Sequence, residues 1–146
     1  SQITVRRDAP PNSLYEIVVL LPLVNTYKTK NMRIVNKKNT EKIYLNLKRK
    51  TSHQGEHENL MNEYFKTSFK KSKSINLKFG EALIFWTPLI HCVGKNTEKE
   101  TRWSLNFRYK NTFSPYGTKQ FIDYFKVANS STVTKLALEQ QSRLIK

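Results

Sequence analysis

The chain has 146 residues, with 26 lysines and arginines against 11 aspartates and glutamates, and a formal net charge of +15. This length predicts a single domain with a core of its own, and an aromatic share of 12% excludes wholesale disorder. A single cysteine excludes both an intrachain disulfide framework and a cysteine-rich zinc site.

The distribution of residues along the chain disfavours two further classes of protein. No apolar run reaches the ~20 residues of a membrane-spanning helix, and the polar start Ser1–Asp8 lacks the apolar stretch of a secretory signal. We therefore expect a cytoplasmic protein without a membrane span. The lysines are spread along the chain, with one dense run over 66–73, which argues against a nucleic-acid partner despite the positive charge.

The first half of the chain is predicted to hold three strands and one helix. An apolar, β-branched run predicts a buried strand over 15–23, and shorter strands are expected over 32–35 and 43–47. In the last of these, Ile43, Leu45 and Leu47 alternate with polar residues. From about residue 55 to residue 70 the apolar positions change to helical spacing, with glutamates at the amino end and lysines at the carboxyl end.

The second half is predicted to be rich in strands up to a turn at 114–117. Strands are expected over 75–79, 82–86, 90–93 and 101–109, and a polar connection joins the last two as a hairpin. Two short helices follow, marked by Phe121, Ile122 and Phe125 and by Val133, Leu136 and Ala137, with Ser131 or Thr132 as the second N-cap. Many short strands with peripheral helices predict a mainly β fold, a sandwich or jelly roll, over residues 1–146.

The strand expected over 101–109 has two different faces. Alternation places Arg102, Ser104, Asn106 and Arg108 on one face, and Trp103, Leu105, Phe107 and Tyr109 on the other. Arg102 and Ser104 offer a guanidinium fork and a hydroxyl to one point, which suits a carboxylate. A solvent-facing polar stripe is the alternative interpretation.

The imidazole of His91 can face the same pocket as Arg102, because the hairpin connects their strands. A satisfied core histidine is the alternative. These residues resemble the carboxyl half of an iron(II)/2-oxoglutarate-dependent oxygenase, through Gly80–Trp86, His91, Asn96 and Arg102–Asn106. The phytanoyl-CoA dioxygenase-like enzymes of carbohydrate biosynthesis clusters are a narrower resemblance, through Asn12–Leu23, Arg108–Asn111 and Phe113–Gly117.

The resemblance implies a double-stranded β-helix, a jelly roll with peripheral helices, that lacks the usual N-terminal elements of the family. Residues 1–146 would then be the C-terminal part of a longer family domain. In this family a His-x-Asp pair and a distant histidine hold iron(II), and an arginine binds 2-oxoglutarate. By the resemblance, Asp8 and His91 are metal ligands, and Arg102 and Ser104 bind 2-oxoglutarate.

The implied activity is that of an oxidoreductase, a 2-oxoglutarate-dependent dioxygenase that hydroxylates a carbohydrate or a related biosynthetic intermediate. Lys30, Trp86 and Asn96 are candidate substrate contacts. Arg6, however, stands where the first iron histidine is expected. A guanidinium stays protonated and offers only donors, so Arg6 cannot be an ordinary ligand and would favour an ion pair with Asp8.

Arg6 therefore leaves open an alternative function, a catalytically degenerate jelly roll that binds a partner or an acidic glycan. The absence of the family's N-terminal strands would expose a sheet edge, so we expect homodimerisation or strand exchange.

Three other features have plainer interpretations. His53 and His57 spell the His-x-x-Glu-His pattern of some zinc peptidases, but Gly55 weakens that helix and a polar loop is favoured. A minor alternative is that His53 or His57 replaces the absent iron ligand. Cys92 is expected as a small buried residue, and Trp86 and Trp103 are expected in the core rather than stacked on a ligand.

Overall fold

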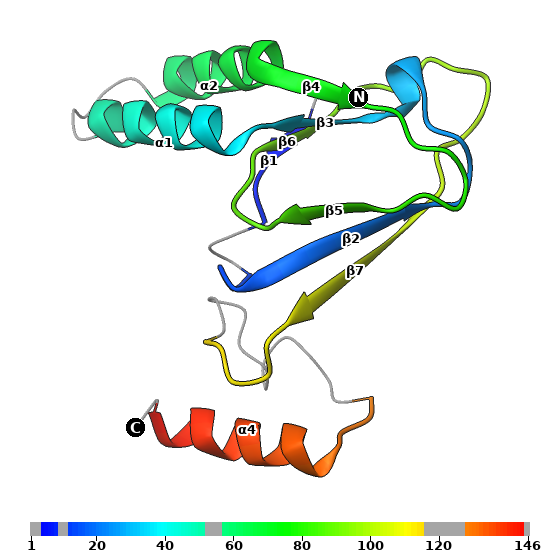
Figure 1. Ribbon diagram of the computed structural model, residues 1–146. Helices are drawn as coiled ribbons and strands as arrows, with labels where there is room; N and C mark the ends of the chain where they lie inside the picture. Colours follow the sequence, from blue (N-terminus) through cyan, green and yellow to red (C-terminus); the bar gives the residue numbers. More distant parts are fainter. Residues whose placement is uncertain (1–3, 9–11, 52–56, 116–127, 145–146) are drawn as a thin grey trace.

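Seven strands of the described chain pair into two antiparallel sheets (Figure 1). The computed structural model describes residues 4–8, 12–51, 57–115 and 128–144. The four-stranded sheet has the order β1 (Thr4–Arg6), β6 (His91–Val93), β3 (Met32–Val35) and β4 (Ser72–Ile75). The three-stranded sheet has the order β5 (Leu83–Trp86), β2 (Glu16–Pro22) and β7 (Ser104–Lys110).

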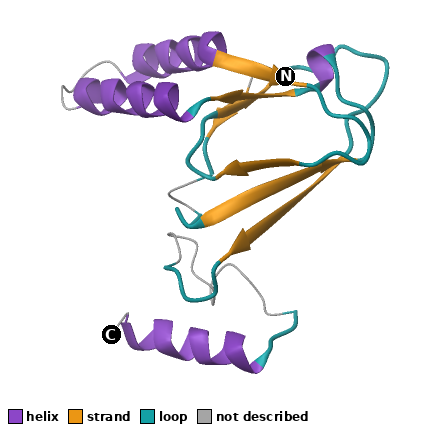
Figure 2. Cartoon of the chain, viewed as in Figure 1, coloured by secondary structure: helices purple, strands orange, loops and turns teal. Residues whose placement is uncertain are grey.

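The helices lie outside the two sheets (Figures 1 and 2). Helices α1 (Lys37–Thr51) and α2 (His57–Lys71) pack together, and α2 contacts β1, β3 and β6 of the four-stranded sheet. Helix α4 (Thr132–Leu144) lies beyond β7, at the opposite end of the molecule from α1 and α2. The four-stranded sheet is therefore the middle layer, with helices on one face and the three-stranded sheet toward the other.

Two apolar clusters follow from this layering. The first joins the helices to the four-stranded sheet and contains Val5, Val35, Ile43, Tyr64, Ile90 and Cys92. The second lies between the sheets and contains Val18, Met32 and Phe85. Because successive side chains of a strand point to opposite faces, Cys92 enters the first cluster while His91 and Val93 face the second sheet.

Residues 43–47 form part of a helix, so the strand predicted there is wrong. The side-chain oxygen of Asn36 accepts a hydrogen bond from the backbone N–H of Asn39 at 2.9 Å, which caps the start of α1. Ile43 and Leu47 lie on the packed side of α1, whereas the side chain of Leu45 is 56% exposed. The helical spacing of the apolar residues, rather than their local alternation, decides this element.

The strand predicted over 75–79 is also displaced. Strand β4 begins directly after α2 and ends at Ile75, and Leu77 forms only an isolated bridge to Thr26. Phe79 is 70% exposed in a turn that Gly80 closes with a φ of +89°, a backbone conformation that favours glycine.

The remaining predicted elements agree with the structure to within a few residues: β2, β3, β5, β6, β7, α2 and α4. Ser131 caps α4, since its hydroxyl accepts a hydrogen bond from the Thr134 N–H at 3.2 Å. The helix predicted around Phe121–Phe125 lies outside the described residues. The antiparallel sheets agree with a jelly roll, but "mainly β" is wrong, because α1 and α2 have 15 residues each and the fold is mixed.

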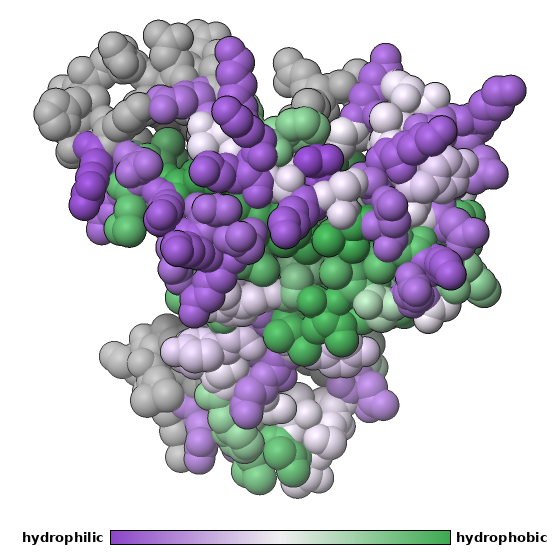
Figure 3. Space-filling view, turned by 45° about the horizontal axis from the view of Figure 1, so that its top comes forward, coloured by the Kyte–Doolittle hydropathy of each residue, from purple (hydrophilic) through white to green (hydrophobic). Residues whose placement is uncertain are grey.

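The outer face of the three-stranded sheet is apolar and exposed. Trp86 is 40% exposed and Trp103 63%, so the prediction that both tryptophans belong to the core is wrong. They share this surface with other exposed apolar residues: Ile17, Ile84, Leu105, Phe107 and Tyr109. Figure 3 shows hydrophilic side chains over the helical layer and a continuous hydrophobic area in the middle of the molecule.

No helix in the described part of the chain has the length and apolarity needed to cross a membrane.

Candidate functional site

The imidazole of His91 lies between the two sheets and is 2% exposed. Its ring meets the ring of Phe85 edge-on, with centroids 5.3 Å apart. Nδ1 lies 3.1 Å from the carbonyl oxygen of Leu89, so Nδ1–H donates to that oxygen. The lone pair of Nε2 is therefore the one that faces the rest of the site.

That lone pair is engaged by Arg6. Strands β1 and β6 pair in a register that sets Arg6 opposite His91. The Nε–H of Arg6 donates a hydrogen bond to Nε2 of His91 at 3.2 Å. The residue at the position expected for the first iron histidine thus bonds to the atom that would itself bind iron.

Asp8 follows β1 and is 8% exposed. Its backbone N–H donates to the Thr87 carbonyl at 3.0 Å, which ties the residue to the turn after β5. Its Oδ1 lies 3.8 Å from His91 Nε2, and its Oδ2 accepts a hydrogen bond from a terminal nitrogen of Arg108 at 2.9 Å. The ion pair that was expected with Arg6 is made by Arg108 instead.

Arg108 is a site residue that sequence reasoning missed. Alternation along the strand did place it on the same face as Arg102 and Ser104, and β7 carries it across from the three-stranded sheet to Asp8. Only the three-dimensional packing of the sheets shows that this face meets the end of β1.

Burial and charge act together on the titration of the site. Burial is the largest cause of a lowered pKa for His91, and the charges of Arg6 and Arg108 lower it further, against the opposing effects of Leu89 and Asp8. The imidazole is therefore neutral at physiological pH. Burial, and then the charge of Arg6, also lower the pKa of Arg102, so both guanidinium groups lie within one electrostatic neighbourhood.

Arg102 lines an open cavity of about 230 Å³. Two of the candidate substrate contacts, Lys30 and Asn96, line the same cavity, together with Thr29, Val93, Gly94 and Thr101. Ser104 begins β7 two residues further on, opposite Pro22, and is exposed. The structure thus brings Arg102, Lys30 and Asn96 together.

Trp86 lies elsewhere. It lines a separate cavity of about 660 Å³ with Leu14, Tyr15 and Ile17, and its indole N–H donates to the Leu14 carbonyl at 2.7 Å. The structure therefore separates Trp86 from the other two candidate substrate contacts.

The side chains around His91 do not fit an iron(II) centre of the expected kind. Such a centre needs two histidines and one carboxylate with lone pairs free for the metal. Here the position expected for one histidine holds Arg6, and Arg108 binds the carboxylate of Asp8. Over the described residues, no group of three or more His, Cys, Asp or Glu side chains could hold a metal ion. The pattern at His53 and His57 lies outside the described side chains.

Two solved structures share the fold of this chain. One is a non-heme monooxygenase, the ThoJ–nickel complex, with a TM-score of 0.54 and 15% identity over 99% of this chain and 56% of that one. The other is SnoN, a non-heme alpha-ketoglutarate-dependent epimerase from nogalamycin biosynthesis, with a TM-score of 0.56 and 16% identity over 90% and 51%. No family model and no curated protein matches the sequence.

These likenesses establish the fold. The two antiparallel sheets match those of double-stranded β-helix oxygenases that depend on non-heme metal chemistry, and the chain spans about half the length of each solved structure. At such low identity the likeness does not carry activity or substrate over to this chain.

Proposed function

We propose that this chain is an oxygenase-fold domain that binds a 2-oxo acid or a related carboxylate at Arg102 without building an iron(II) centre from its own residues. The observation that carries the proposal is the hydrogen bond from Arg6 Nε to His91 Nε2. A guanidinium occupies the lone pair of the distal histidine and adds a permanent positive charge where a cation would have to enter.

The surroundings of Arg102 support carboxylate binding. Arg102 is partly buried, and the positive charge of Arg6 acts on it in addition to its own. In a partly dehydrated cavity, a guanidinium binds a carboxylate through two parallel hydrogen bonds. Arg6 places a fixed positive charge beside His91. In metal-loaded sites, the metal ion supplies this charge.

The second candidate is the 2-oxoglutarate-dependent dioxygenase that the sequence resemblance implies, acting on a carbohydrate or a related intermediate. One observation favours it: Asp8 Oδ1 and His91 Nε2 lie 3.8 Å apart and are the two expected ligands. Iron could bind there only if Arg6 released His91 Nε2, since Arg108 binds Oδ2 of Asp8 and not the Oδ1 that faces His91. The phytanoyl-CoA dioxygenase-like subgroup and the carbohydrate substrate stay predictions.

Calorimetry with 2-oxoglutarate and Mn²⁺, a redox-inert stand-in for iron(II), separates the two candidates. We expect the natural chain to bind 2-oxoglutarate with the same affinity with and without Mn²⁺, and Arg102→Ala to bind at least about tenfold more weakly. Arg6→His should create stoichiometric Mn²⁺ binding. Arg7→His is the matched control, because the Arg7 guanidinium lies 4.0 Å from the centre of the Tyr44 ring, toward α1.

Stoichiometric Mn²⁺ binding by the natural chain, unchanged in Arg6→His, would overturn the proposal in favour of the dioxygenase. Failure of the natural chain to bind any 2-oxo acid would overturn the carboxylate site itself.

A further inference from the structure

A lysine with no exposed surface borders the Arg102 cavity. Lys30 ends the short 3-10 helix η1 (Lys28–Lys30), and its side chain is 0% exposed. Its ammonium group forms an ion pair with Glu100 at 2.5 Å and lies 4.6 Å from the centre of the Tyr27 ring. A buried ammonium is costly unless it is paired, so the carboxylate of Glu100 stabilises this arrangement.

Glu100 is not buried in the same way. Its side chain is 64% exposed, although its partner Lys30 is fully covered. It belongs to the polar connection between β6 and β7, and the hydroxyl of Tyr27 donates to the same carboxylate oxygen at 3.4 Å. Releasing Glu100 would return a carboxylate to water at little cost, whereas leaving Lys30 without an anion would be costly.

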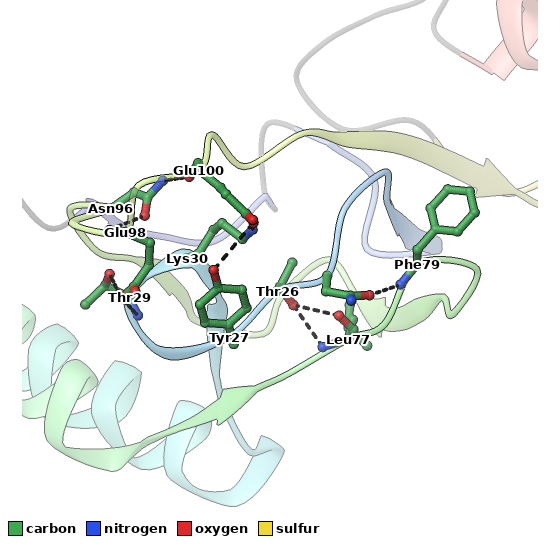
Figure 4. Close-up of polar contacts among 10 residues, drawn as sticks. Thr26, Tyr27, Thr29, Lys30, Leu77, Phe79, Asn96, Glu98 and Glu100 are labelled. Carbon is green, nitrogen blue, oxygen red and sulfur yellow. Dashed lines mark hydrogen bonds and ion pairs between the residues drawn. The ribbon is translucent and has the colours of Figure 1, made fainter.

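The connection that carries Glu100 is held against η1 by neighbouring hydrogen bonds (Figure 4). The Thr29 hydroxyl donates to Glu98 Oε1 at 2.7 Å, and the Asn96 side-chain amide donates to the Glu100 carbonyl at 2.7 Å. These contacts place the Glu100 carboxylate on Lys30, but they do not depend on that carboxylate. The connection can therefore keep its shape when the ion pair opens.

Arg102 lies two residues beyond Glu100 and lines the same cavity as Lys30. No acidic side chain in the described ranges forms an ion pair with Arg102, whereas Lys30 already holds a carboxylate. Two cations thus line the cavity: Arg102, which has no carboxylate partner among the described residues, and Lys30, which already holds the carboxylate of Glu100. Its volume of about 230 Å³ admits a small dicarboxylate.

We propose that Glu100 is a built-in competitor for the ligand of this cavity, which is a small dicarboxylate. One ligand carboxylate binds Arg102, and the other takes the place of Glu100 on Lys30. The exchange replaces one carboxylate by another, so the buried ammonium never loses its counter-charge. This inference rests on the proposed carboxylate site at Arg102. It adds Lys30 as the second contact and the Glu100 carboxylate as the group that competes for it.

The test is calorimetric titration of succinate, with propionate as the monocarboxylate of similar size. Glu100→Gln should bind succinate roughly three- to tenfold more tightly than the natural chain, because the competitor is lost. Glu98→Gln is the matched control, since Glu98 lies in the same connection but bonds to Thr29, and its affinity should stay within about twofold. Lys30→Met should bind succinate no more tightly than propionate.

A second measurement needs no substitution. The bond from Lys30 is the largest cause of a lowered pKa for Glu100, and the Tyr27 hydroxyl lowers it further. Carboxyl NMR of the natural chain should show this pKa return upward toward the ordinary glutamate range when succinate is saturating. The pKa of the Glu98 carboxyl, lowered mainly by its bond to Thr29 and less by the charges of Lys28 and Lys30, should move much less.

The outcomes separate the two proposals. Suppose that Arg102→Ala abolishes binding, but Glu100→Gln has the succinate affinity of the natural chain and saturating succinate leaves the pKa of Glu100 unchanged. The competitor role is then wrong and the carboxylate site stands. If neither the natural chain nor Glu100→Gln binds succinate or 2-oxoglutarate, both proposals are wrong. Succinate binding by Glu100→Gln alone, with 2-oxoglutarate still bound by the natural chain, would support the competitor.

Discussion

At the scale of single residues, the site is organised by two arginines that engage both expected metal ligands. Arg6 donates to the imidazole of His91, and Arg108 donates to the carboxylate of Asp8. Each bond satisfies a buried polar group that would otherwise be left without a partner. The cluster is thus a hydrogen-bonded unit in its own right, in which the side chains of His91 and Asp8 are paired by protein groups.

The lowered pKa of His91 predicts how stability depends on pH. Because the folded state favours the neutral imidazole, the unfolded chain binds the extra proton first as the pH falls. Stability should be constant above the ordinary histidine pKa of about 6.5 and should decrease as the pH falls from there toward the lowered folded value.

Urea unfolding at pH 7.5 and pH 5.5 measures this effect. The loss of stability on acidification should be smaller in His91→Gln, in which the other two histidines remain. An equal loss in both proteins would show that another group is responsible.

At the scale of elements, helix α1 shows where reading a short pattern fails. Alternation over 43–47 predicted a strand, yet Ile43 and Leu47 belong to a longer helical stripe that includes Thr40 and Tyr44 and leaves Leu45 exposed. Three apolar residues cannot distinguish the two periods. The cap at Asn36 and the packing of α1 against α2 decide the outcome.

A pair of substitutions within α1 tests this assignment. Ile43→Ala should lower the free energy of unfolding by about 2–4 kcal/mol, because it opens a cavity in the cluster beneath the helices. Leu45→Ala, at an exposed position two residues away, should change it by no more than about 0.5 kcal/mol. Chemical denaturation measures both, and similar losses would contradict a helix with this orientation.

Much of the remaining fold could be predicted from sequence because strands such as β2 carry a continuous apolar, β-branched run. The grouping of Arg102 with Lys30 and Asn96 was within reach for the same reason, since strand ends and their connections limit where these residues lie. The role of Arg108 and the exposure of Trp86 and Trp103 could not be predicted. They depend on which sheet face meets which layer, and a single strand does not carry that information.

At the scale of the whole molecule, the net charge of +15 has opposite effects on folding and on binding. Like charges repel one another in the folded state, whereas the same field attracts an anionic ligand to the Arg102 cavity. Added salt screens both interactions over about 10 Å at 0.1 M ionic strength.

Raising sodium chloride from low to moderate concentration should therefore weaken succinate binding and raise the melting temperature. We expect a loss of affinity of roughly three- to tenfold by calorimetry. Thermal unfolding followed by circular dichroism measures the melting temperature. A melting temperature that falls with salt would mean that local ion pairs outweigh the overall repulsion. Homodimerisation or strand exchange, expected from the sequence because of an exposed sheet edge, stays a prediction.

Strand β6 serves two layers at once, since Cys92 packs under the helices while its neighbour His91 faces the three-stranded sheet. A deletion of one residue before β6 would exchange these two directions, placing an imidazole among methyl groups and a thiol beside Arg6. A single deletion would therefore disrupt both the packing under the helices and the chemistry of the site at His91. Point substitutions, by contrast, can alter either layer separately, so natural variation in β6 should be rich in replacements and nearly free of length changes.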